Sequence, residues 1–253
     1  MKRILHISMV MMIVLITSVA WAEGAGGYIE AEGVIYYEKG MTPNQMRRMS
    51  IMDAYRYLAE EVDALNVTSE TTVKNLRKMN DTINIKVTAA LRGAKVISVN
   101  RESDGSFHAI VRLPTHGGSE SLAGAVLQEN IRVEEFLEPK FVNIRSEINY
   151  TGLVIDCRGL KLKEAIAPAI KTVRGKEIYA YKNIGYEKAV EKGIVEYTNE
   201  IKNARAGERP LIVKAVKIAG KCDVIVSEED AEKILSANKL SKILVNCAVV
   251  LVR

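Results

Sequence analysis

The sequence has few of the side chains that usually carry catalysis or bind metals. Its 253 residues include three histidines and three cysteines, and no two cysteines stand at the short spacing of a zinc motif. It has no G-x-S-x-G, H-E-x-x-H or P-loop signature. The glycine-rich stretch at 24–27 precedes an expected strand, whereas a phosphate-binding loop follows one. We therefore expect no enzyme activity and no catalytic, cofactor-binding or metal-binding residues.

Only two histidines follow the first 22 residues. His108 falls on one face of an expected strand, and His116 falls in a glycine-rich loop. Together they could supply two metal ligands, but the sequence places no carboxylate to complete a site.

Long runs of charge of one sign are also lacking. The chain has 36 basic and 31 acidic residues and a formal net charge of +5. Residues 1–22 hold two basic residues and no acidic one, so their removal lowers the charge to +3. Basic and acidic residues alternate along the polar segments, which is typical of solvated surfaces. Nucleic acid is not an expected partner.

One long apolar run stands at the N-terminus. Two basic residues precede a mostly apolar run over 4–19, and the small-x-small pattern Ala20-Trp21-Ala22 follows. This order is typical of a secretory signal, and the run is shorter than the roughly 20 apolar residues of a spanning helix. We expect residues 1–22 to be a signal peptide cleaved after Ala22, with an uncleaved anchor as the alternative. No cysteine near Ala22 could carry a lipid, so we expect a periplasmic protein without a stable membrane anchor.

The three cysteines lie in the second half, beside strand-like runs. An oxidising compartment would permit one disulfide and leave one thiol. Three buried free thiols are the equally open alternative. Spacing does not choose a pair among Cys157, Cys222 and Cys247.

The first half predicts a small sheet covered by one long helix. Alternating side chains predict a strand over 28–37, and Thr42, Pro43 and Gln45 form a capping box that opens a helix over 43–65. One face of this helix carries an apolar stripe, which two further residues widen. Its members are Ile51, Tyr55, Leu58, Val62 and Leu65, with Met52 and Ala59 at the sides.

Shorter elements follow this helix. Residues 67–73 are rich in β-branched side chains and predict a strand, 74–81 a loop and 82–91 a short helix. Two alternating runs, 95–100 and 107–113, flank Asp104-Gly105 and predict a hairpin.

The segment 114–121 breaks the pattern and marks a boundary. We divide the chain into a signal peptide (1–22), a first domain (28–114), a linker (115–149) with a helical turn at 122–128, and a second domain (150–253). The second domain predicts strands at 153–157, 177–181, 211–218, 223–226 and 246–252, and helices at 187–204 and 228–237. The expected fold class is α+β: two small α/β domains, the first a strand-helix-strand-strand sheet with one long helix on it.

The first half resembles the LPP-twenty lipoprotein family and the N-terminal domain of the flagellar proteins FlgP and FlgT. The resemblance rests on Glu30-Ala31-Glu32-Gly33, Arg48, the sequence IMDAYRYLAEEV at 51–62, and Asn66-Val67. The second half, from 151 on, resembles a segment that follows this domain in envelope proteins. The resemblance implies a non-enzymatic envelope domain that assembles into larger structures, around the flagellar motor in FlgT-like members.

We therefore expect a periplasmic structural or assembly protein, associated with the flagellar motor if it follows FlgT-like members. Its partners would be other envelope proteins or copies of itself in a homo-oligomer. The alternative is a periplasmic ligand-binding module with a pocket between the two halves.

Overall fold

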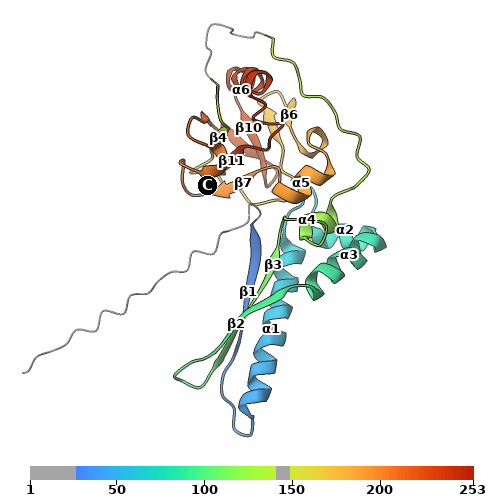
Figure 1. Cartoon of the computed structure of the whole chain (residues 1–253), viewed down its shortest axis with the longest axis vertical. Coiled ribbons are helices and arrows are strands. Elements are labelled where there is room, and N and C mark those ends of the chain that lie inside the picture. Colours follow the sequence, from blue (N-terminus) through green and yellow to red (C-terminus); the bar gives the residue numbers. More distant parts are fainter. Residues whose placement is uncertain (1–26, 141–148) are drawn as a thin grey trace, which may run out of the picture.

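The computed structural model describes residues 27–140 and 149–253 of the chain. The expected signal peptide, with its cleavage after Ala22, lies outside the described residues. The N-terminal and C-terminal halves form two parts that follow one another along the long axis of the molecule (Figure 1).

The first part is a three-stranded antiparallel sheet with one long helix on one face. Its strands are β1 (Tyr28–Ile35), β2 (Lys95–Arg101) and β3 (Phe107–Pro114), in the order β1-β3-β2. Helix α1 (Pro43–Ala64) packs along β1 and β3 (Figure 1). The expected strand, helix and hairpin are confirmed, as is the α+β class.

Local signals start α1 and close the hairpin at the expected residues. Thr42 Oγ1 accepts the backbone N–H of Gln45 at 3.3 Å, and Gln45 Oε1 accepts that of Thr42 at 2.9 Å. In the hairpin, Asp104 accepts the backbone N–H of Ser106 at 2.9 Å, and Gly105 takes a φ of +85°, which glycine adopts without steric cost.

The buried face of α1 is rotated from the predicted stripe. Met52, expected beside the core, is 71% exposed. The reason is a close approach of backbones, because a Cβ on Gly33 of β1 would stand 2.1 Å from the Ser50 carbonyl oxygen and 2.2 Å from the Ala54 nitrogen. Small residues therefore face the sheet, which a stripe of large apolar residues does not predict. The buried residues of α1 are Met46, Ser50, Ala54, Leu58 and Val62.

The predicted strand at 67–73 and loop at 74–81 are wrong. The segment after α1 bends and then enters α2 (Val73–Met79). Helix α3 (Asp81–Arg92) follows and confirms the short helix predicted at 82–91. Side-chain caps start both helices: Thr72 Oγ1 accepts the Asn75 N–H at 3.3 Å, and Asn80 Oδ1 accepts the Ile83 N–H at 3.2 Å.

The second part contains two four-stranded sheets. The first, in the order β7-β11-β4-β8, is all parallel and combines β4 (Leu153–Asp156), β7 (Glu196–Thr198), β8 (Leu211–Lys214) and β11 (Val249–Val252). The second, in the order β6-β5-β10-β9, combines β5 (Ile170–Thr172), β6 (Glu177–Tyr179), β9 (Lys217–Ala219) and β10 (Asp223–Val226). Helix α6 (Glu228–Ser241) starts at the expected N-cap, Ser227.

Two elements that were predicted as continuous in this part are each divided in the structure. The helix expected over 187–204 ends early, because α5 (Tyr186–Lys192) stops at Gly193 with a φ of +70° and the chain continues into β7. The strand expected over 211–218 splits into β8 and β9, which belong to different sheets.

The two parts share a continuous apolar core. Ile166 N–H donates to the Asn66 carbonyl at 3.1 Å and Ala167 N–H to the Val67 carbonyl at 2.8 Å. Ser69 Oγ donates to the buried Asp223 carboxylate at 2.9 Å. Helix α4 (Leu122–Val126), the expected helical turn, is buried at this junction, so the first part and the second are fixed to one another.

Candidate functional site

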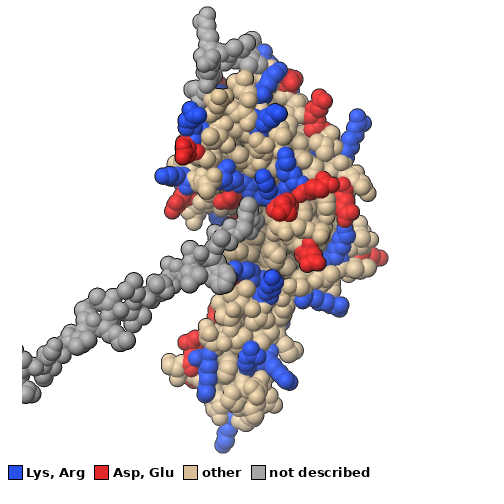
Figure 2. Space-filling view, viewed as in Figure 1, with Lys and Arg blue, Asp and Glu red and all other residues tan. Residues whose placement is uncertain are grey.

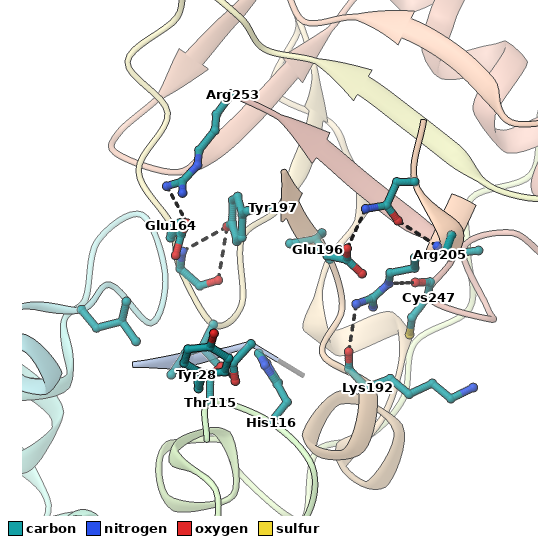
Figure 3. A pocket seen from close by; sticks show the side chains of 18 of the residues that line it. Tyr28, Thr115, His116, Glu164, Lys192, Glu196, Tyr197, Arg205, Cys247 and Arg253 are labelled. Carbon is teal, nitrogen blue, oxygen red and sulfur yellow. Dashed lines mark hydrogen bonds and ion pairs between the residues drawn. The ribbon is translucent and has the colours of Figure 1, made fainter. Parts of the chain in front are cut away.

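A pocket of about 920 Å³ lies between the two parts. One wall comes from the start of β1 and the segment after β3. The other comes from the segment around α5 and β7, from the short turn η2 (Ala204–Ala206), and from the chain just before β11. Six of its lining residues are Tyr28, Thr115, His116, Glu196, Arg205 and Arg253 (Figure 3).

Arg205 is the most constrained cation of this pocket. Its Nε donates to the Cys247 carbonyl at 2.7 Å and its Nη1 to the Lys192 carbonyl at 2.9 Å, while Nη2 donates to the Gly193 carbonyl. These bonds hold the end of α5 against the start of β11 (Figure 3). Removal from water lowers the pKa of the guanidinium, and no carboxylate of the described residues forms an ion pair with it.

His116 lies against the same turn. A Cβ on Gly193 would stand 3.0 Å from His116 Nε2. This nitrogen is buried and has no hydrogen-bond partner among the described residues. Burial, and then the charge of Arg205, lower the pKa of His116 to about 4, so its imidazole is neutral at pH 7.

The carboxylates of the pocket have partners. Glu164 forms an ion pair with Arg253 at 2.5 Å, and Glu196 accepts an N–H from Asn203 at 2.7 Å. The exposed ammonium group of Lys192 has no partner among the described residues.

His108 lies far from this pocket, toward the other end of β3. The two histidines are therefore not brought together, because the strand from His108 to Pro114 alone spans roughly 20 Å. A carboxylate that the sequence pattern did not place lies beside His108. The Nδ1 of His108 lies 2.7 Å from Glu32 Oε1 because the antiparallel register places β1 beside β3.

A serine completes this cluster. His108 Nε2 lies 3.1 Å from Ser106 Oγ, which also donates to Asp104 Oδ1 at 2.6 Å. A serine, a histidine and a carboxylate in this order form a hydrolytic triad when the serine is accessible. Ser106 is 1% exposed, so the cluster has the contacts of a triad and no access for a substrate. The described residues hold no group of three or more metal-ligating side chains.

Of the two alternatives for the cysteines, one disulfide or three buried free thiols, the structure has the second. Cys157, Cys222 and Cys247 are buried free thiols. Burial raises the pKa of Cys157 and of Cys222 to about 12. Neutral buried thiols act as small apolar side chains.

The open edges of the first sheet are a second candidate site. β1 and β2 each pair only with β3, so the outer edge of each has no strand partner among the described residues. β1 carries Glu30 and Glu32, which pair with Arg112 and His108 of β3, and no basic residue, whereas β2 carries Lys95 and Arg101 and no acidic residue. Elsewhere the visible face interleaves both signs of charge (Figure 2).

The two edges differ in shape as well as charge. A shallow hollow of about 290 Å³ follows β1 and is bordered by Tyr57 and Glu61 of α1. On β2, Val96 is 41% and Ile97 is 47% exposed, and the strand bulges at Ile97. Sequence reasoning missed that β1 and β2 are the two edges of this sheet, because that requires the strand order. The charge contrast between 28–35 and 95–101 was the available signal.

The comparisons agree with the division into two parts. Residues 24–114 match the sequence model of the LPP20 lipoprotein family, and residues 152–253 match that of the second domain of Treponema pallidum Tp0624. No curated protein matches the chain. The first domain is therefore similar to the LPP20 lipoprotein family, as the resemblance predicted. In the described part of the chain, no helix is both long and apolar enough to cross a membrane.

Proposed function

We propose that this protein is a non-enzymatic structural component of the cell envelope that assembles with copies of itself through the first domain. The similarity of the first domain to a lipoprotein family supports the envelope location. Export by the N-terminal signal with cleavage after Ala22 and, following FlgT-like proteins, a position near the flagellar motor are the finer parts of the proposal.

The observation that carries the proposal is the pair of free edges with opposite charge. A contact between two β2 edges would bring Lys95 and Arg101 against the same residues, and a contact between two β1 edges would bring glutamates together. Like charges directly opposite one another destabilise a strand pair, whereas opposite charges stabilise it. The acidic β1 edge of one copy therefore fits the basic β2 edge of the next.

Such a contact joins two different surfaces. Each added copy leaves one free β1 edge and one free β2 edge, so the contact builds either a closed ring or an extending chain. Pairing would also cover the exposed apolar side chains of Val96 and Ile97 and satisfy the outward backbone groups of both strands.

Charge reversal on β2 tests the proposal. Lys95→Glu with Arg101→Glu would place acidic residues on both edges, and we expect sedimentation velocity of residues 23–253 to show a shift from oligomers to monomers. High salt should weaken the wild-type assembly, because the attraction between exposed charges is screened.

The matched control is Lys74→Glu with Lys78→Glu, which changes net charge equally on the exposed surface of α2. It should assemble as the wild type does. Monomeric wild-type protein at millimolar concentration and low salt, or equal loss of assembly in the control, would sink the proposal.

A further inference from the structure

Two segments of the second part, 156–163 and 214–221, run side by side and form a basic surface. The pairing of β4 with β8 places Asp156 beside Lys214, and Ala215 N–H donates to the Asp156 carbonyl at 2.9 Å. Further along, Lys163 N–H donates to the Lys221 carbonyl at 3.0 Å. The six exposed basic residues of this surface are Arg158, Lys161, Lys163, Lys214, Lys217 and Lys221.

This basic surface carries more positive charge than the exported chain as a whole. Its two segments hold six basic residues and one acidic residue, a net charge of +5. Residues 23–253 have a net charge of +3, so the remainder of them carries −2. The one acidic residue, Asp156, pairs with Arg158 at 2.7 Å. None of the five lysines forms an ion pair with a carboxylate of the described residues.

The carboxylates that flank the two segments do not neutralise the basic surface. Glu164 and the buried Asp223 each form an ion pair with a basic residue outside it. The exposed Glu70 lies at its border, because the preceding Ser69 is in contact with Gly220. With Glu70 included, the surface keeps a net charge of +4. A partner of this surface is therefore negatively charged.

The kind of basic residue and its surroundings favour one class of anionic partner. An ammonium group is strongly hydrated, and lysine is depleted in protein–protein interfaces. None of the six basic residues lines the interdomain pocket, so they do not enclose a small molecule. Two apolar side chains accompany them, because Ile212 is 53% and Val216 is 51% exposed on either side of Lys214 in the chain. An extended anionic surface with an apolar layer beneath it matches this combination.

We propose that the basic surface binds the anionic headgroups of a phospholipid membrane, and that this contact is separate from assembly through the first domain. Each lysine near such a membrane adds to the attraction, which decays within a Debye length. Ile212 and Val216 would be covered at the boundary between headgroups and acyl chains. The contact would hold the protein at a membrane reversibly, without a spanning helix in the described part of the chain.

Vesicle co-sedimentation tests this proposal. Residues 23–253 are mixed at low salt with vesicles of equal parts phosphatidylcholine and phosphatidylglycerol, and separately with vesicles of phosphatidylcholine alone. We expect binding to the anionic vesicles that is stronger by roughly tenfold or more than binding to the neutral ones, and release at high salt. Binding to soluble polyglutamate without binding to the anionic vesicles would assign the surface to an acidic protein and overturn the proposal.

Two pairs of lysines supply the variants. Lys161→Gln with Lys217→Gln should weaken partition into the anionic vesicles about 25-fold, at roughly fivefold for each lysine. The matched control is Lys192→Gln with Lys202→Gln. These exposed lysines flank β7, at the opposite edge of the parallel sheet from β8, and their loss should change partition by about twofold at most. Equal losses in the two double variants would show that net charge alone drives binding and would overturn the proposal.

Discussion

At His116, removal of the imidazole from water and the positive charge of Arg205 both favour the neutral ring and lower its pKa to about 4. In the unfolded chain the same side chain titrates near 6.5. Between these two values the unfolded chain binds more protons than the folded one, so stability rises with pH and falls as pH drops through this window.

Replacement of His116 by asparagine should remove this pH dependence. We expect the wild type to lose on the order of 2 kcal/mol more stability than His116→Asn between pH 6.5 and 4.5, after allowance for partial exposure of the ring. Urea unfolding at the two pH values measures the difference. Identical losses in the two proteins would show that His116 is protonated in the folded state at pH 4.5.

Gly33 decides how closely α1 approaches the sheet. A Cβ at this position would overlap two backbone atoms of the helix, at 2.1 Å and 2.2 Å, and backbone cannot rotate away as a side chain can. Gly33→Ala should therefore lower the free energy of unfolding by about 1–3 kcal/mol or more through overpacking.

Gly93 offers a matched control for this prediction. It ends α3 with a φ of −80°, and a Cβ there would meet its nearest atom at 3.4 Å. Gly93→Ala should be neutral or slightly stabilising, because alanine restricts the unfolded chain. Equal melting temperatures for the two variants would contradict the close packing of α1 on β1.

Among the elements, those with local signals could be predicted from sequence. The capping box at Thr42 starts α1, and Asp104-Gly105 turns the hairpin, because the residues that make these contacts are at most three apart. The elements that were predicted wrongly depend on distant partners in the chain. β7 exists because it pairs with β11 about 50 residues later, and no local pattern in 187–204 reports that partner.

At the scale of the whole molecule, the candidate sites could be predicted even less. The pocket unites Tyr28, His116, Arg205 and Arg253, which are distributed over nearly the whole chain. The contact of Glu32 with His108 depends on the register between β1 and β3. Sequence reasoning found the histidines and the glutamates but not their neighbours, because strand order and domain packing determine which of them meet.

Pairing of the β1 edge with the β2 edge of another copy is the central claim, and cysteine cross-linking tests it most directly. The three native thiols are buried, so cysteines introduced at exposed positions report alone. Tyr57 lies beside the β1 edge and Ile97 lies on the β2 edge. The two single variants are Tyr57→Cys and Ile97→Cys. A mixture of the two single variants with a short bismaleimide should give a covalent dimer, and either variant alone should give far less. Equal yields from the mixture and from each variant alone, or no dimer in the mixture, would contradict the account.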